Sequence, residues 1–475
     1  MSVRPVELQS QVLSTLLGDG SRRWLSPRLS RGRFLRARCI VAYMLIGLFC
    51  ALPLLTVRGK PALLIDLPRR ELTVFGFTFL PTDTVLLALM LVALIVGICL
   101  ATALLGRVLC GWMCPQTVYM EFVYRPLERL FDGAPGARHK AGRQTSPLRM
   151  VLKYAAYLLV SAWLAHTFVA YFVGVEALKG WIGRSPLDHP IAFSVAAIVT
   201  GLMVFDFSYF REQMCIVACP YGRFQSVMLD RESLIVSYDR RRGEPRGRAK
   251  PGNEGPRGDC IDCGSCADTC PTGIDIRGGL QLECIACTQC IDACNAVMDR
   301  VGKPRGLIRF SSQSRMEGNP GRLLRPRVVL YPAVMLGLVA AFTVVLLRKQ
   351  PADVTLLRGL GTPFTELAPG EITNQLRVKI KNRSDSDAVY RIGVADEAPA
   401  RVSQAADRVE VKAGDSATTA IMITAPATAF RNGQYDIALR VSDGGAFSQD
   451  LPYRLLGPRQ GATPGDLPST SGERP

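Results

Sequence analysis

Three features that would narrow the function of this chain are missing from its sequence. No G-x-G-x-x-G fingerprint opens a strand-to-helix turn, so no nicotinamide or flavin site is visible. No apolar run lies near Met1, so the first residues are not expected to form a cleavable signal peptide. No cysteine follows Cys294, so the residues after it offer no disulfide. If the chain transfers electrons, they must come from a separate reductase or from quinol.

Histidine is also scarce, with three residues in 475. His139 and His189 lie in expected loops and point to no function. His166 lies in an apolar segment, with Tyr171 a little over one helical turn away. An ionisable group in a membrane span is a functional hypothesis by default, whereas a neutral histidine bonded to a neighbouring helix would be structural. Both interpretations of His166 stay open.

Charge and hydropathy together indicate a multi-domain membrane protein. The chain is too long for one domain, 48% of its residues are hydrophobic, and its mean hydropathy is +0.17. The net charge of +17 could indicate nucleic-acid binding. However, the lysines and arginines cluster beside apolar segments, which fits the positive-inside rule better and predicts no nucleic-acid partner.

Five segments are long and apolar enough to cross a bilayer. They are residues 39–57, 84–106, 154–178, 190–207 and 328–347. The basic N-terminal tail (1–38) and the links 107–153 and 211–327 are rich in arginine, whereas the links 58–83 and 179–189 are less basic. With five spans, the positive-inside rule places the N-terminus and the 211–327 link in the cytoplasm and the C-terminus outside.

Eight of the fifteen cysteines form one motif twice, C-x2-C-x2-C-x3-C, with Pro271 after the first run and Asn295 after the second. In bacterial two-cluster ferredoxins the fourth cysteine of each run ligates the other cluster. The expected [4Fe–4S] ligands are Cys260, Cys263, Cys266 and Cys294 for cluster 1, and Cys284, Cys287, Cys290 and Cys270 for cluster 2. Two such clusters predict one-electron transfer.

Two other interpretations of these cysteines are weaker. Structural zinc also uses C-x2-C pairs, but it does not explain a third cysteine at x2 and a fourth at x3 in both runs. A disulfide scaffold is disfavoured if this segment is cytoplasmic.

A shorter motif, C-x3-C-P, also occurs twice. Its cysteines are Cys110 and Cys114 in one copy, and Cys215 and Cys219 in the other. Spacing i, i+4 would place two thiols on one helix face, and the proline lets a new helix start after the second cysteine. Each motif follows a span that runs inward, so the first four spans look like two helical hairpins. This repeat could bring the four thiols together.

Soft thiolates select Cu(I), zinc or iron–sulfur centres, and Met113 and Met214 beside the motifs would suit Cu(I). Packing cysteines at helix ends are the alternative. Cys39, Cys50 and Cys99 have no such spacing and are expected to be buried small hydrophobes. Asp206 and Glu212 lie near the second motif and are expected to pair with arginines.

The expected fold is a membrane bundle of about five helices with a cytoplasmic two-cluster ferredoxin-like insert and a C-terminal immunoglobulin-like β-sandwich. Alternating runs at 374–381, 389–394, 408–411, 418–424, 435–441 and 450–455, separated by turn signals, predict the sandwich strands. The expected parts are a tail (1–38), a membrane region (39–230), a mobile Gly/Pro/Arg linker (231–258), the insert (259–310), a last span (328–347), the sandwich (352–456) and a disordered tail (457–475).

The chain closely resembles the FixG/CcoG/RdxA-type cytochrome c oxidase accessory proteins. The resemblance covers about residues 33–456 and depends on both C-x3-C-P motifs, the phrase 210–215 (FREQMC), the run 270–277 (CPTGIDIR), the phrase 282–285 (LECI) and the sandwich. It implies an iron–sulfur protein of the bacterial inner membrane that is needed to assemble cbb3-type oxidase. Family members are understood to reduce Cu(II) to Cu(I).

The resemblance implies that the eight ferredoxin cysteines bind the clusters and that the four C-x3-C-P cysteines bind copper. Expected partners are oxidase subunits or copper-delivery proteins, and the chain could form a homodimer. Two alternatives remain open: a quinol-linked electron-transfer subunit of the NapH/NosR type, and an assembly scaffold with structural clusters. The sandwich favours the FixG pattern over the NapH/NosR type.

Overall fold

The structure is a computed structural model of the chain. It describes residues 15, 21–81, 83–133, 146–247, 257–319, 325–359, 361–368, 370–384, 386–395, 399–404, 408–445 and 447–458. The chain divides into two compact units, Met1–Thr343 and Val344–Pro475. His139 and nearly all of the expected disordered tail lie outside the described residues.

Within the described part of the chain, five helices are long and apolar enough to span a membrane, as the sequence predicted. They are α1 (Arg33–Ala51), α2 (Thr84–Leu105), α7 (Pro147–Val173), α9 continued by the π-helical turn η2 (Pro190–Phe210), and α15 (Pro326–Leu347). Helix α1 starts before the expected residue 39 and α7 before the expected 154. The first turn of α1 contacts Asp292 of the insert, and Lys153 near the start of α7 pairs with Asp132, contacts that average hydropathy does not detect.

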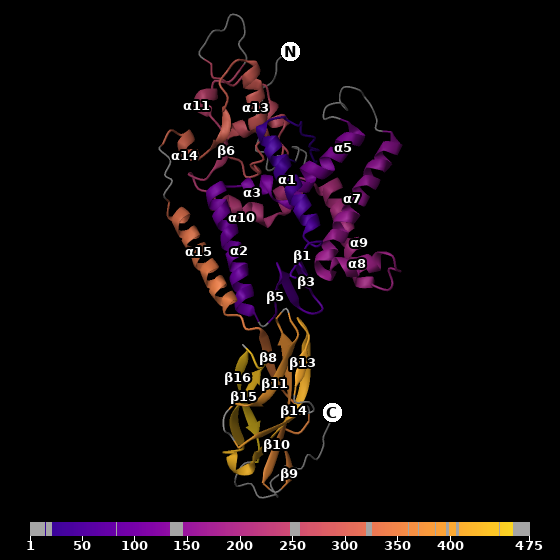
Figure 1. Ribbon diagram of the computed structural model, residues 1–475. Helices are drawn as coiled ribbons and strands as arrows, with labels where there is room; N and C mark the ends of the chain where they lie inside the picture. The colour runs from indigo at the N-terminus through magenta and orange to yellow at the C-terminus, as the bar shows by residue number, and fades with distance from the viewer. Residues whose placement is uncertain are drawn as a thin grey trace, which may run out of the picture. The chain divides into compact units, whose positions relative to one another are not determined.

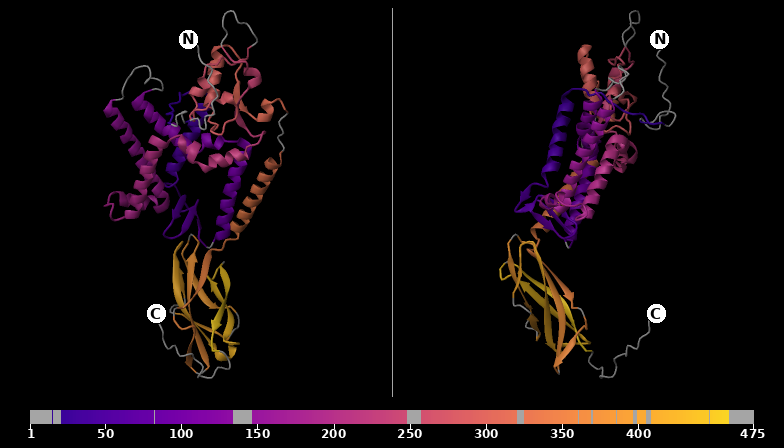
Figure 2. Two further views of the ribbon diagram at one scale, coloured as in Figure 1. Left: turned by 180° about the vertical axis from the view of Figure 1, so that it is seen from behind. Right: turned by 90° about the vertical axis from the view of Figure 1, so that its right-hand side faces the viewer.

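The spans form neighbouring pairs. Figure 1 shows α2 beside α15, and α7 beside α9. At the α2–α15 pair, Phe79 just before α2 lies 6.4 Å from Phe342, centroid to centroid. Figure 2 shows the spans from behind and from the side. Most of their large apolar side chains are exposed, as lipid-facing surfaces require.

A small sheet occupies the link between α1 and α2, where only a loop was expected. Strands β3 (Leu63–Asp66), β4 (Glu71–Val74) and β5 (Phe77–Phe79) pair antiparallel in that order, next to a hairpin of β1 (Thr56–Val57) and β2 (Lys60–Pro61). Figure 1 shows this sheet at the end of the spans opposite the ferredoxin-like insert. Helix α8 (Val175–Ile182) lies at the same end.

The ferredoxin-like insert is larger than its cysteine runs. Strand β6 (Ile235–Tyr238) pairs antiparallel with β7 (Ile308–Ser311), and the helices are α11 (Arg240–Gly243), α12 (Ser265–Asp268), α13 (Gln289–Arg300) and α14 (Gln313–Met316). Residues 235–243 are therefore not the mobile linker that was expected. Tyr238 is buried in the insert's core, and Arg242 pairs with Asp259.

The described part of the N-terminal tail packs on the insert instead of lying free. Leu25 is buried against Gly273, and the N–H of Arg28 donates to the carbonyl of Asp268 at 2.9 Å. Asp292 of α13 accepts from the N–H of Leu35 at 2.8 Å, which supplies an acceptor to the first turn of α1. The start of the first span is thus tied to the insert.

The second unit is an antiparallel β-sandwich. One sheet has the order β12-β14-β10-β8 with β9 on β10, and the other has β13-β11-β15-β16. The strands are β8 (Ala352–Arg358), β9 (Thr365–Ala368), β10 (Glu371–Asn382), β11 (Ala388–Val394), β12 (Arg401–Gln404), β13 (Val409–Val411), β14 (Ser416–Pro426), β15 (Gln434–Ser442) and β16 (Ser448–Leu456).

Alternating side chains of both sheets form the sandwich core, in which Leu376, Ile421 and Leu439 are fully buried. All six expected runs overlap observed strands. Strands β8, β9 and β12 were missed.

Candidate functional site: two cysteine cavities beside the C-x3-C-P motifs

The two cysteine runs of the insert adopt the same backbone turn. The residues before the second cysteine, Asp262 and Ala286, have φ of 52°. The residues after it, Gly264 and Thr288, are also left-handed and begin α12 and α13, which carry the third cysteines. Three of these four residues are not glycine, and such strain concentrates at functional sites. The turn directs three thiols of each run toward one point.

The described cysteines of the insert surround two cavities. The first is lined by Cys260, Cys263, Cys266 and Cys294. The second is lined by Cys270, Cys284, Cys287 and Cys290, and Cys266 lines it as well. This grouping is the one that crossed ligation requires, with one cysteine exchanged between the runs.

The donor set of each cavity fits an iron–sulfur cluster. Burial raises the pKa of Cys266 to about 12, and burial raises the pKa of Cys284 to about 11. Four thiolates crowded into an apolar cavity need a cationic centre to offset their charge. Among the described residues, no three His, Cys, Asp or Glu side chains are placed to hold a single metal ion.

The two C-x3-C-P motifs share a backbone pattern. Four residues before the first cysteine of each motif, Gly106 (φ 59°, ψ −128°) and Arg211 (φ 52°, ψ −123°) end the preceding span. A short helix follows, α3 (Val108–Trp112) with Cys110, or η3 (Met214–Ala218) with Cys215.

After each motif a new helix begins with proline in its first position. It is α4 (Pro115–Tyr119) after the first motif and α10 (Pro220–Met228) after the second. This restart was predicted, but the shared helix face was not observed. The second cysteines, Cys114 and Cys219, are extended caps of the next helix. The two thiols of each motif therefore belong to different helices.

The repeat brings the four C-x3-C-P cysteines into one neighbourhood. Burial raises the pKa of Cys215 to about 12, and nearby Cys114, Cys110 and Cys219 raise it further. Burial likewise raises the pKa of Cys110 to about 11. The Cys110 thiol donates to Gln225 Oε1 at 2.9 Å. Met113 and Met214, proposed from sequence as copper ligands, are both exposed.

The first motif packs directly on the second ferredoxin run. Cys110 forms a small buried cluster with Ile285 and Cys287, and Tyr221 packs against it. A Cβ at Gly111 would lie 2.4 Å from the Ile285 carbonyl oxygen, so only glycine permits this approach. Arg107 also donates to the carbonyl of Leu282. The distance between these two motifs could not be predicted from the sequence.

The second motif approaches the same cavity from another side. A third cavity is lined by Cys215, Thr272, Ile285 and several charged residues. Thr272 and Ile285 also line the second cysteine cavity. Both C-x3-C-P copies therefore lie next to the cavity of Cys270, Cys284, Cys287 and Cys290.

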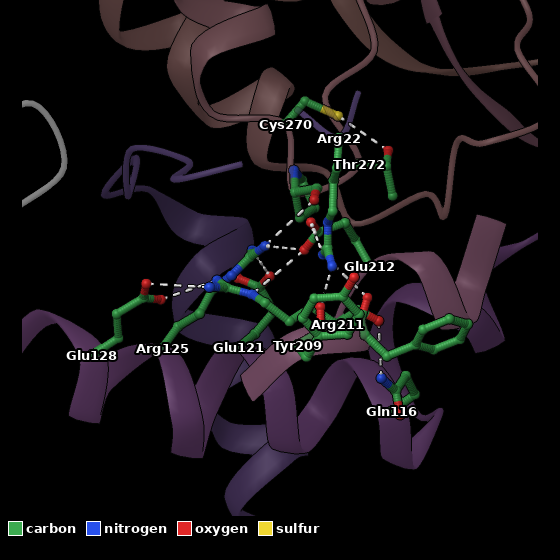
Figure 3. A network of polar contacts seen from close by, with 12 residues as sticks. Arg22, Gln116, Glu121, Arg125, Glu128, Tyr209, Arg211, Glu212, Cys270 and Thr272 are labelled. Carbon is green, nitrogen blue, oxygen red and sulfur yellow. Dashed lines mark hydrogen bonds and ion pairs between the residues drawn. The ribbon is translucent and has the colours of Figure 1, made fainter. Parts of the chain in front are cut away.

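A buried network of charges joins the membrane helices to the insert (Figure 3). Glu212 contacts three guanidinium groups, at 3.1 Å to Arg22, 3.6 Å to Arg211 and 3.8 Å to Arg125. Arg125 begins α5 (Arg125–Asp132), and its guanidinium donates to the Pro271 carbonyl at 3.4 Å. The expected pairing of Glu212 with arginines is confirmed.

The remaining polar and cysteine predictions have mixed outcomes. Asp206 makes no ion pair among the described residues, so its expected pairing with an arginine is wrong. His166 Nδ1 lies 2.7 Å from the Ala162 carbonyl of its own helix, not a neighbouring one. Cys39, Cys50 and Cys99 are half-buried instead of buried.

We expect Arg125→Met to destabilise the first unit strongly. Arg125 is 3% exposed, and its loss would leave Glu121 and Glu212 with less compensation in the interior. Breaking a buried ion pair by removing one partner costs about 3–5 kcal/mol. Lys179→Met is the matched control, because its pair with Glu176 is exposed and worth at most about 0.5 kcal/mol. Equal thermal unfolding of both variants in detergent would contradict a structural role for the network.

Comparison with known proteins agrees with these features. Residues 210–313 match a family model described as a 4Fe-4S dicluster domain, and residues 87–133 match one described as a 4Fe-4S binding domain. Residues 342–458 match a model of the immunoglobulin-like fold at the C-terminus of FixG.

Three relatives match most of the chain. Protein RdxB of Cereibacter sphaeroides is 33% identical over 84% of this chain and 88% of its own length, and Protein RdxA of the same organism is 32% identical over 88% and 93%. Nitrogen fixation protein FixG of Rhizobium meliloti is 30% identical over 76% and 77%. Given these matches and its paired cysteine motifs, the chain belongs to the FixG/RdxA family of iron–sulfur electron-transfer proteins.

Proposed function

We propose that this protein reduces Cu(II) to Cu(I) for assembly of the copper centre of a cbb3-type oxidase. The observation that supports this most is the buried cluster that Cys110 of the first C-x3-C-P motif forms with Ile285 and Cys287 of the second ferredoxin run. Because the two sets of cysteines meet in one cluster, an electron would have a short path between them. Separate, distant sets would have favoured a purely structural role for one of them.

The proposal assigns the insert's cysteines by cavity. Cys260, Cys263, Cys266 and Cys294 would hold one [4Fe–4S] cluster, and Cys270, Cys284, Cys287 and Cys290 would hold the other. When bound, each cluster supplies one-electron chemistry. The surrounding apolar residues exclude water, and the left-handed turns fix the thiols before binding.

The four C-x3-C-P cysteines would bind copper as the substrate. Cu(II) takes one electron and becomes Cu(I), and the reduced iron–sulfur protein loses one. Thiolates prefer Cu(I) to Cu(II), so binding at these residues favours the reduction. The thiol pKa values above neutrality mean that copper must displace protons from Cys110 and Cys215 as it binds. Gln225 accepts a hydrogen bond from the Cys110 thiol, which copper binding would break.

The reaction needs an external reductant. The chain offers no nicotinamide or flavin fingerprint, so the donor would be a separate reductase or a quinol of the membrane. Oxidase subunits or copper-delivery proteins would take the Cu(I) product. The sandwich, in which no catalytic side chains were expected, would serve as the surface for such partners.

The proposal places the insert in the cytoplasm and the sandwich in the periplasm. The arginine-rich 211–327 link motivates this orientation, and the small β1–β5 sheet at the other end of the spans fits a non-cytoplasmic link. A cytoplasmic reporter fused after Arg242 should be active, and the same reporter fused after Pro351 should be inactive. The reverse pattern would mean that the chain has the opposite orientation.

The function is tested by reducing the purified protein anaerobically, removing the reductant, and adding Cu(II) with a Cu(I)-specific chelator. We expect about two Cu(I) per chain, since each of two clusters stores one electron. Protein left in the oxidised state is the control and should yield none. Reduced clusters that persist in the presence of Cu(II) would refute the proposal.

A second candidate function for the C-x3-C-P cysteines has one observation in its favour. The segment that matches the description 4Fe-4S binding domain, residues 87–133, contains Cys110 and Cys114. Soft thiolates also select iron–sulfur centres, so these four cysteines could hold a further cluster in an electron-transfer chain. Iron analysis separates the two, because the copper proposal expects about eight iron atoms per chain and a further cluster would exceed that.

A further inference from the structure

Two arginines of the membrane region are buried beside the second cysteine cavity. Arg38 of α1 is 1% exposed. Its Nε donates to the Gly111 carbonyl at 3.0 Å, and its guanidinium lies 5.3 Å from the Phe122 ring. Its two terminal nitrogens have no hydrogen-bond partner. Arg38 has no ion-pair partner among the described residues.

Arg107 approaches the same cavity after α2. It is 7% exposed, and its Nη2 donates to the Gly222 carbonyl at 2.9 Å. Its Nε has no hydrogen-bond partner, its other nitrogens donate to the carbonyls of Leu282 and Gly222, and its charge and a side-chain hydrogen bond lower the pKa of Cys110. Burial raises the pKa values of Cys287 and Cys284, and Arg38 and Arg107 respectively oppose that rise. The positive charges of both arginines therefore favour the thiolate form of cysteines in the second cavity.

Buried cations without a counter-charge are costly, so an anion is expected nearby in the working protein. Asp292 faces the start of α1, but it accepts backbone N–H groups of Phe34 and Leu35 and not the Arg38 guanidinium. The four thiolates of the second cavity, with the iron–sulfur group that they would hold, would supply negative charge near both arginines, and Cys110 is a further thiol beside Arg107.

The first cavity has a different charge balance. Arg277 lies near Cys266, but Asp275 holds it through contacts of 2.6–3.1 Å, and Asp262 pairs with it as well. The charge of Arg242 opposes the rise that burial causes in the pKa of Cys294, and Arg242 is paired with Asp259. The cations at the first cavity are thus neutralised by carboxylates, whereas those at the second are not.

We propose that Arg38 and Arg107 raise the reduction potential of the cluster held by Cys270, Cys284, Cys287 and Cys290 above that of the other cluster. Adding an electron adds one negative charge at the site, and an unpaired cation in an apolar interior stabilises that charge. The inference rests on the ligand assignment made above, but it needs no copper.

The consequence is a direction for electron flow. Cys263 of the first cavity is exposed, whereas Cys287 of the second is buried against Cys110. Electrons would enter at the exposed cluster and collect at the one next to the C-x3-C-P cysteines. Arg38 and Arg107 thereby act as tuning residues that do not themselves touch the substrate.

The test is a redox titration of the full-length protein, followed by electron paramagnetic resonance, without copper. In Arg38→Met one of the two potentials should fall, while the other stays at the parent value. Arg38→Lys keeps the charge and should restore most of the potential. Arg300→Met is the control, because it removes an exposed arginine of the insert whose charge is screened by solvent.

The same titration in a Cys263→Ser background assigns the shifted potential, which should belong to the cluster that remains. If Arg38→Met does not assemble its clusters, Arg107→Met provides the same comparison. Unchanged potentials in the assembled variant, or a fall confined to the first-cavity cluster, would overturn the inference. A potential that falls as expected in a protein that cannot reduce Cu(II) would refute the proposed function and leave this inference standing.

Discussion

Replacing all four C-x3-C-P cysteines by serine is expected to abolish Cu(II) reduction while both clusters remain. The residues are Cys110, Cys114, Cys215 and Cys219. Serine keeps the size of the side chain but removes the soft ligand that favours Cu(I). Losing second-shell partners of a metal costs about 10–100-fold in affinity or activity, so we expect the loss of direct ligands to exceed that range. The readouts are copper bound per chain and the rate of Cu(I) release to a chelator.

The control uses the cysteines outside any motif. Cys39→Ser, Cys50→Ser and Cys99→Ser together change three half-buried thiols in the same unit and should retain the parent rate. Iron content must stay equal in both variants, so that a loss of rate is not a loss of clusters. If the four-cysteine variant still binds and reduces copper at the parent rate, the motifs are structural and the copper site lies elsewhere.

Single replacements in the insert are expected to remove clusters in crossed pairs. Cys263→Ser should lose the signal of the same cluster as Cys294→Ser, although these residues belong to different runs. Cys270→Ser should match Cys284→Ser for the same reason. The physical basis is the grouping of the thiols around two cavities, since Cys294 of the second run lines the first cavity and Cys270 of the first run lines the second.

The measurement is iron content together with electron paramagnetic resonance of each reduced variant. The parent should hold about eight iron atoms per chain, and each variant should lose about half of them. Cys270→Ser matching Cys263→Ser instead would mean that each run holds its own cluster. Zinc near two equivalents, with no iron, would remove the iron–sulfur assignment altogether.

The sequence could predict elements whose signal is local. Apolar length identified five spans, and alternation identified most strands of the sandwich. Polar first turns, such as Arg33–Arg38 at the start of α1, were missed because hydropathy averages cannot see Asp292 supplying an acceptor 257 residues along the chain. Strand β6 was missed for a similar reason, since its partner β7 lies about seventy residues later and a Gly/Pro/Arg-rich segment follows it.

In the candidate site too, features encoded locally could be predicted and contacts between distant segments could not. Cysteine spacing predicts twelve candidate ligands, and the turns that bring three thiols of each ferredoxin run together are encoded within a few residues. The contact of Cys110 with Cys287, the network around Glu212 and the position of Arg38 were not predictable, since each depends on how the insert docks on the membrane helices. One residue of the sequence did carry a sign of this docking. Gly111 follows Cys110 at a position where a Cβ would collide with the insert.

The most direct test of the account is electron paramagnetic resonance of the reduced protein frozen before and after one equivalent of Cu(II) is added. We predict that one electron leaves the clusters for each copper, so that reduced-cluster signal is lost and no Cu(II) signal appears. In the four-cysteine serine variant the cluster signals should persist beside an undiminished Cu(II) signal. Intact reduced clusters together with a full Cu(II) signal in the parent protein would contradict the account.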